Sequence, residues 1–192
     1  MHRHFVLHKP SGVLSQFINN KTRKKKLLGD LFDFPEGTMA IGRLDAHSEG
    51  LLFLTTDGKV SAQVCGRKFE KEYWVQVDGV IDEPALEKLR NGVAIRAEGV
   101  DFVTLPCPAR KFEEAPKVAA GRRIREERHG PTSWISITLR EGKNRQVRRM
   151  TAAVGFPTLR LIRYRIGSCK LDDLAPAEVR EVLTFEPNLE KQ

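Results

Sequence analysis

Residues 42–50 hold the side chains of this sequence that are best suited to chemistry. Arg43, Asp45 and His47 lie there in a polar loop that has a glycine at each end and an apolar run on each side. Such a layout places side chains at the end of a rigid sheet, where binding and catalytic residues concentrate. The alternative is that Arg43 and Asp45 only hydrogen-bond the turn and each other. These residues alone leave both interpretations open.

Several common catalytic motifs do not occur in the sequence. It has no Gly-x-x-x-x-Gly-Lys phosphate loop, no nucleophile elbow and no His-Glu pair of a metalloprotease. The cysteines are widely spaced without a C-x-x-C pair, and His2, His4 and His8 have no Cys or acidic partner nearby, so we expect no metal site. A nuclease or glycosidase generally needs paired carboxylates or a divalent metal, and no such cluster accompanies Asp45.

The net positive charge is concentrated in one stretch of the chain. Lys and Arg number 33 against 25 Asp and Glu, which gives +8. Residues 142–170 contain eight basic side chains and no acidic one, whereas the remaining chain has 25 of each sign. The charge favours a polyanionic partner, either nucleic acid or an anionic membrane surface. An ordinary solvated face is the alternative.

A helix is expected to begin at Asn144 inside this basic stretch and to end before Gly155 and Pro157. On its wheel Arg145 and Arg149 point to solvent. Arg148 lies at the border of the apolar stripe, where its guanidinium could reach into a cleft while its stem stays packed. The stripe consists of Val147, Met150, Thr151 and Val154.

The elements that must position these residues alternate between strands and short helices. Strand patterns occur at 5–8, 51–56, 72–77 and 133–139, and helical patterns at 27–32, 59–65 and 82–91. Without regular βαβ units or repeats, the order predicts an α+β fold with a largely antiparallel mixed sheet and flanking short helices. We expect one domain over residues 1–192, two-lobed, with a flexible insertion at 113–131.

Nothing in the sequence predicts export or membrane insertion. No apolar run approaches the ~18 residues that span a bilayer, and the N-terminus lacks the hydrophobic segment of a signal peptide. We therefore expect a cytoplasmic protein.

The loop at 42–50 and the residues after it closely resemble the central motif of the RsuA-like family of ribosomal RNA pseudouridine synthases. Other segments agree in order, and the resemblance covers roughly residues 5–185. We expect the chain to begin directly at the catalytic region, without the small N-terminal S4-like RNA-binding domain that many members carry. The matching segments are Gly42-Arg43-Leu44-Asp45, Ser48 to Gly58, Lys9-Pro10-Ser11-Gly12, Lys71-Glu72-Tyr73, Glu141 to Met150, Leu161-Ile162-Arg163 and Ile166-Gly167.

The resemblance implies a pseudouridine synthase catalytic fold that isomerises a specific uridine of 23S ribosomal RNA, without a cofactor. Asp45 would be the catalytic nucleophile. A desolvated carboxylate needs a cation in contact to stay ionised, and the family pattern supplies it as Arg148, with Arg149 as the fallback. Tyr73 would stack on the uracil and act as an acid or base. An ordinary core tyrosine is the alternative for Tyr73.

The resemblance also implies that the target uridine is flipped out of its stack, at a cost of a few kcal/mol. Arg43 would insert into the RNA at the vacated position. We expect a monomer whose partner is ribosomal RNA, the alternative being a non-catalytic ribosome-associated RNA-binding protein. The remaining candidate contacts to RNA are His47, Lys71, Lys143, Arg145, Arg149, Arg163 and the basic loop 21–26.

Overall fold

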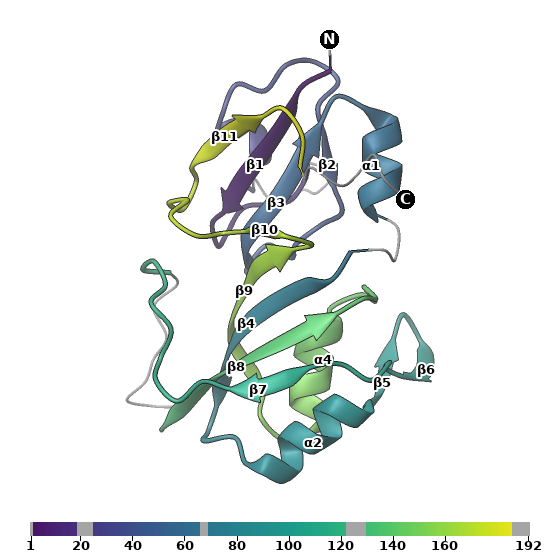
Figure 1. The fold of residues 1–192 in the computed structure, drawn as a ribbon, viewed down its shortest axis with the longest axis vertical. Coiled ribbons are helices and arrows are strands. Elements are labelled where there is room, and N and C mark those ends of the chain that lie inside the picture. The colour runs from purple at the N-terminus through teal and green to yellow at the C-terminus, as the bar shows by residue number, and fades with distance from the viewer. Residues whose placement is uncertain (1, 19–24, 66–68, 122–129, 186–192) are drawn as a thin grey trace. The chain divides into compact units, whose positions relative to one another are not determined.

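The computed structural model describes residues 2–18, 25–65, 69–121 and 130–185 (Figure 1). The chain divides into two compact units. The first unit comprises Met1–Glu70 and Arg163–Gln192, and the second unit comprises Lys71–Ile162. Each unit has its own hydrophobic core.

An antiparallel sheet forms the centre of the first unit. β1 pairs with β3 and β11, and β2 also pairs with β3. All seven residues of β3 are buried, as its continuous apolar run predicts. The core gathers Phe5 and Leu7 of β1 with Leu52 and Leu54 of β3. The elements are β1 (His4–Lys9), the 3-10 helix η1 (Leu28–Asp30), β2 (Met39–Ile41), β3 (Glu49–Thr55), α1 (Gly58–Cys65), β10 (Cys169–Lys170) and β11 (Val179–Val182).

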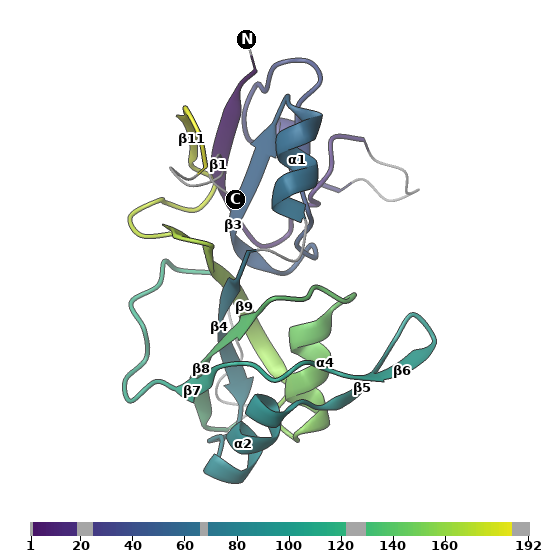
Figure 2. The same cartoon turned by 45° about the vertical axis from the view of Figure 1, so that its right-hand side comes forward.

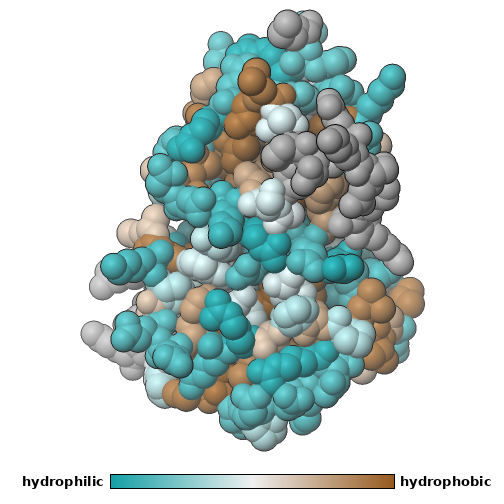
Figure 3. Space-filling view, viewed as in Figure 1, coloured by the Kyte–Doolittle hydropathy of each residue, from teal (hydrophilic) through white to brown (hydrophobic). Residues whose placement is uncertain are grey.

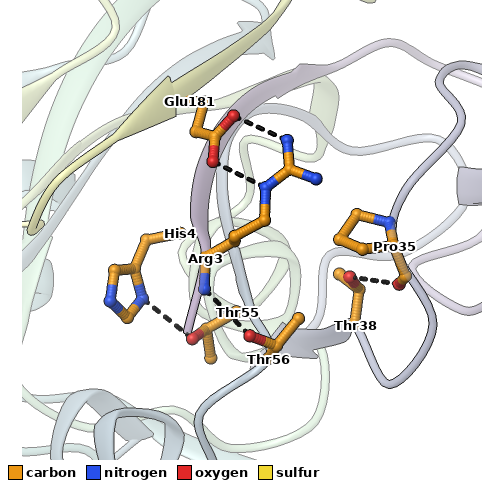
Figure 4. Close-up of polar contacts among 7 residues, drawn as sticks. All are labelled: Arg3, His4, Pro35, Thr38, Thr55, Thr56 and Glu181. Atoms are coloured by element: carbon orange, nitrogen blue, oxygen red, sulfur yellow. Dashed lines mark hydrogen bonds and ion pairs between the residues drawn. The ribbon is translucent and has the colours of Figure 1, made fainter. Parts of the chain in front are cut away.

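Polar contacts close the edge of this unit beside its N-terminus (Figure 4). Arg3 makes two hydrogen bonds of 2.7 Å to the carboxylate of Glu181, which joins the start of β1 to β11. The Arg3 backbone N–H donates to Thr56 Oγ1 at 2.9 Å, and His4 Nδ1 lies 2.9 Å from Thr55 Oγ1. In the described residues no group of three or more His, Cys, Asp or Glu could hold a metal ion.

The second unit packs two helices against an antiparallel sheet in which β4 pairs with β8 and β8 with β7. Figure 2 shows α4 on one side of these strands. The core joins Val75 of β4, Ile135 of β8, Leu86 of α2 and Met150 of α4. The elements are β4 (Lys71–Asp78), α2 (Glu83–Asn91), β5 (Ala94–Ala97), β6 (Val100–Val103), β7 (Ala109–Lys111), β8 (Thr132–Leu139) and α4 (Gln146–Ala153), while β9 (Thr158–Ile166) runs from this unit into the first.

A separate hairpin, β5 paired with β6, projects from the second unit. Figure 3 shows an apolar patch over this hairpin, where Val100 and Val103 are 64% and 66% exposed. Ile95 and Ala97 of β5 are buried. Val100 is paired with Ala97 and Val103 with Ala94, so the two exposed valines lie on opposite faces of the hairpin.

The predicted α+β fold class is confirmed, and the sequence signals located most elements. Asp82 caps α2 as expected, with Ala85 N donating to its carboxylate at 2.9 Å. The helix predicted from Asn144 begins instead at Gln146, because Arg145 takes a left-handed conformation with φ 51°. Within the insertion predicted at 113–131, residues 113–121 form no helix or strand, and 122–129 lie outside the described residues.

None of the helices in the described ranges is long and apolar enough to cross a membrane.

Candidate functional site

The loop that carries Asp45 follows β2, precedes β3 and is held by backbone contacts. Ser15 Oγ donates to Leu44 O at 2.8 Å and accepts from Leu44 N at 3.0 Å. Ser48 N donates to Asp45 O at 3.0 Å. The Asp45 side chain is half-buried, whereas Arg43 and His47 are exposed. The carboxylate of Asp45 therefore lies on a fixed loop between two exposed side chains, the guanidinium of Arg43 and the imidazole of His47.

Lys9, at the end of β1, is the main anchor of this loop. It is fully buried, and its Nζ donates to the carbonyl oxygens of Pro10, Val13 and Ala46 at 2.9, 2.7 and 3.2 Å. Burial lowers the pKa of Lys9 to about 8. Glu49 and Asp45 oppose this shift, while the charge of Arg163 adds to it. Sequence reasoning assigned Lys9 no role, although it opens the Lys-Pro-Ser-Gly segment that matched the family.

Arg163 was predicted to contact phosphate, and the structure contradicts this. Its side chain is only 3% exposed, its Nε donates to Leu51 O at 2.7 Å, and its buried Nη2 has no hydrogen-bond partner among the described residues. A methyl group on Gly50 would lie 2.3 Å from Arg163 O. Arg163 therefore packs closely behind the start of β3 and adds positive charge to the interior of the first unit, where it acts on Lys9.

Tyr73 lies on β4 in the second unit, opposite Ile137 of β8. It is half-buried, and its ring packs against the core of that unit. Its neighbour Glu72 accepts hydrogen bonds from Trp74 Nε1 and Ser136 Oγ at 3.0 and 2.9 Å, on the opposite face of the strand. The ring of Tyr73 therefore makes the core contacts of a packing residue without being fully enclosed by them.

The arginines of α4 differ in their surroundings. Arg145 is exposed, while Arg148 is half-buried with its Nε enclosed, as expected for a residue at the border of the apolar stripe. Arg149 was predicted to point to solvent, but it is half-buried and bonded to backbone carbonyl groups. Its guanidinium donates to the carbonyl oxygens of Asn144 and Arg96, the former at 3.0 Å. These bonds hold Arg149 against β5, which argues against its fallback role beside Asp45.

The other predicted RNA contacts differ in exposure. Lys143 is exposed, with its Nζ 5.3 Å from the centre of the Phe102 ring, and Lys71 is half-buried. Residues 21–24 of the basic loop lie outside the described residues, whereas Lys25 and Lys26 are exposed. The predicted site residues fall in both units. Arg43, Asp45, His47, Arg163 and, from the basic loop, Lys25 and Lys26 belong to the first unit, and Lys71, Tyr73, Lys143, Arg145, Arg148 and Arg149 belong to the second.

Residues 3–153 match the family model described as RNA pseudouridylate synthase, which covers most of the chain. The chain belongs to the RNA pseudouridylate synthase family. It is 43% identical over 179 residues to ribosomal large subunit pseudouridine synthase E of Vibrio vulnificus, covering 92% of this chain and 74% of that protein. It is 44% identical over 174 residues to the protein of the same name from Xanthomonas axonopodis, covering 89% of each.

A solved structure agrees with this family membership. The crystal structure of a pseudouridylate synthase superimposes with a TM-score of 0.74 at 26% identity, covering 95% of this chain and 70% of that chain. The family resemblance seen in the sequence is thus confirmed, and with it the fold class and the enzyme class. This member of the pseudouridylate synthase family is an isomerase that acts on uridine in RNA.

Proposed function

We propose that the chain converts a specific uridine of large-subunit (23S) ribosomal RNA to pseudouridine, with Asp45 as the nucleophile. Two relatives named for large-subunit pseudouridine synthesis, 43% and 44% identical over most of the chain, support this substrate. The observation that carries the role of Asp45 is its place on the loop at 42–50. Asp45 is half-buried, and the backbone on both sides of it is held by hydrogen bonds. Ser15 bonds the backbone of Leu44, and Lys9 bonds the carbonyl oxygen of Ala46.

The reaction needs no cofactor, because uridine and pseudouridine are isomers and the nucleoside is neither oxidised nor reduced. The bond between N1 of uracil and C1′ of ribose breaks, the uracil turns, a bond forms between C5 and C1′, and the C5 proton is released while N1 regains one. Asp45 attacks the sugar or the base and leaves again at the end of the cycle. A fixed loop favours such an attack because the carboxylate is oriented before the substrate arrives.

Arg148 and Tyr73 complete the proposed catalytic set. Arg148 would keep the desolvated carboxylate ionised, which is consistent with its enclosed Nε at the border of α4. Tyr73 would stack on the uracil and exchange a proton with it, using the part of its ring that the core leaves uncovered.

RNA binding is assigned to the exposed cations. Arg43, two residues before Asp45, would replace the flipped base in the stack. Lys143 and Arg145 would bind phosphates, with His47 and Lys71 as further contacts. Arg163 is not included, because it is buried.

The test is Asp45→Asn, assayed by tritium release from RNA labelled at C5 of uridine and by carbodiimide-dependent primer-extension stops. We expect activity to fall by about three orders of magnitude or more, with RNA affinity within about twofold of wild type. Asp101→Asn is the matched control, because Asp101 is an exposed carboxylate of the second unit. Unchanged stops in Asp45→Asn would support the non-catalytic RNA-binding alternative. Stops on 16S rather than 23S RNA would contradict the proposed substrate.

A further inference from the structure

Gln146, the first residue of α4, has a buried polar side chain that the proposed mechanism does not use. It is 3% exposed. Its Oε1 accepts a hydrogen bond from Lys143 N at 2.9 Å, and its Nε2 donates to Glu141 Oε1 at 2.6 Å. The same oxygen of Glu141 accepts from Leu105 N at 2.8 Å. The amide of Gln146 therefore joins α4 to the preceding turn and, through Glu141, to the segment that follows β6.

The turn at residues 141–146 needs such support. Arg145 has φ 51° and ψ 33°, a left-handed conformation, and no side chain caps the helix at this position. A residue with a Cβ adopts this conformation at a cost in free energy, so the surrounding contacts must stabilise it. The hydrogen bond from Gln146 N to Lys143 O, 3.1 Å long, closes the turn, and the side-chain bonds of Gln146 fix it on both sides.

The conformation of the turn decides where its cations lie. Lys143, Asn144 and Arg145 are exposed, whereas Gln146 and Val147 directly after them are buried. The turn thus holds two cations on its outer surface while its one acidic side chain, Glu141, accepts hydrogen bonds from Leu105 and Gln146. Cations held at a fixed spacing bind a phosphate backbone at less entropic cost than mobile ones.

We propose that Gln146 and Glu141 form a clamp that holds Lys143 and Arg145 in position for adjacent phosphates of the RNA. The proposal rests on the proposed function and adds a positioning residue to it. The clamp acts on substrate affinity more than on turnover, because Val147 and Met150 anchor α4 in the core independently of the turn.

An exchange of the two side chains tests the clamp. Gln146→Glu places a carboxylate oxygen where the amide nitrogen now lies 2.6 Å from Glu141, so repulsion should open the turn. In the double variant Glu141→Gln/Gln146→Glu the two carboxylates no longer face each other, and the amide at position 141 can either donate to residue 146 or accept from Leu105 N, so two of the three hydrogen bonds can form again. Glu141→Gln alone keeps every bond and should resemble wild type. The double variant also has the net charge of wild type.

We expect Gln146→Glu to weaken RNA binding and raise KM about tenfold, with kcat within about twofold. The double variant should recover part of this loss, with RNA affinity and KM between those of Gln146→Glu and wild type. Hydrogen exchange at the amide of Lys143 should accelerate in the single variant and slow again in the double variant. Lys88→Gln, which removes one positive charge from an exposed position of α2, is the control for net charge alone.

Equal binding by Gln146→Glu and Lys88→Gln would overturn the clamp, as would a folded double variant that binds RNA no more tightly than Gln146→Glu. If Gln146→Glu fails to fold, Gln146→Leu replaces it. The clamp then requires that Gln146→Leu binds RNA more weakly than wild type and that adding Glu141→Gln does not restore the affinity. Wild-type RNA affinity in Gln146→Leu would overturn the clamp. Wild type and Asp45→Asn are assayed in parallel. Loss of the proposed function would appear as an inactive wild type, whereas failure of the clamp would appear as unchanged RNA affinity in an active enzyme.

Discussion

Lys9 Nζ donates a hydrogen bond to the carbonyl oxygen of Ala46, 3.2 Å away and 37 residues further along the chain. Ala46 directly follows Asp45, so a buried ammonium at the end of β1 holds the backbone that carries the proposed nucleophile. The same nitrogen also bonds Pro10 O and Val13 O, which ties three segments of the first unit to one charge.

Lys9→Met should lower turnover more than RNA affinity. The methionine fills similar space but donates no hydrogen bond, so the backbone around Asp45 loses its anchor. We expect kcat to fall about tenfold with Kd for RNA within about twofold, measured by tritium release and filter binding. Lys59→Met, at an exposed position of α1, is the control. Equal kcat in the two variants would contradict an anchoring role for Lys9.

The stability of the protein should depend on Lys9 at alkaline pH. Burial lowers the pKa of this lysine to about 8 from 10.5, with Glu49 and Asp45 opposing the shift and Arg163 adding to it. Between these pH values the unfolded chain binds more protons at this site than the folded chain, so the site's contribution to the free energy of unfolding rises with pH. Relative to Lys9→Met, wild type should gain on the order of 3 kcal/mol between pH 8 and 10.5. If the free energies of unfolding of wild type and Lys9→Met, measured with urea, change in parallel with pH, this prediction is wrong.

Two glycines at the ends of the loop at 42–50 should differ in their tolerance of alanine. At Gly50, with φ 106°, a Cβ would lie 2.3 Å from Arg163 O, whereas at Gly42, with φ 69°, nothing lies within 4 Å. Gly50→Ala combines strain with a backbone clash and should cost about 3 kcal/mol or more. Gly42→Ala should cost about 1 kcal/mol. Urea unfolding measures both, and similar losses would be inconsistent with the close packing at Gly50.

Arg148 and Arg145 should affect different steps. Arg148→Ala removes the proposed partner of Asp45, and we expect kcat to fall about 100-fold with RNA affinity changed by less than threefold. Arg145→Ala removes an exposed cation, so it should weaken binding several-fold, leave kcat unchanged and reduce the slope of log Kd against log salt concentration by about one. Identical effects on binding would mean that the two arginines are interchangeable surface charges.

Arg149→Ala should affect stability rather than chemistry. This guanidinium donates to the carbonyl oxygens of Arg96 and Asn144, and their loss should cost about 1 to 2 kcal/mol in the free energy of unfolding. We expect kcat within about threefold of wild type below the melting transition. A loss of kcat as large as that of Arg148→Ala would restore Arg149 as the candidate partner of Asp45.

Local patterns in the sequence were sufficient for the elements with strong signals. The continuous apolar run after Gly50 predicted β3, and Asp82 with Pro84 predicted the start of α2. The polar loop at 42–50 between apolar runs marked Asp45 as a candidate. These signals are reliable because hydrophobic periodicity and capping depend on neighbouring residues alone.

The burial of charged residues required the tertiary structure. Arg163 and Lys9 look like solvated cations in the sequence, but each lies in the interior of the first unit, bonded to carbonyl groups of segments distant along the chain. Arg149 was placed on the solvent side of a helical wheel, but it is half-buried and donates to a carbonyl oxygen of β5. A sequence determines the number of charges and the local periodicity. Which charges lose their water depends on which distant backbone carbonyls can replace it, and only the folded chain brings those carbonyls together.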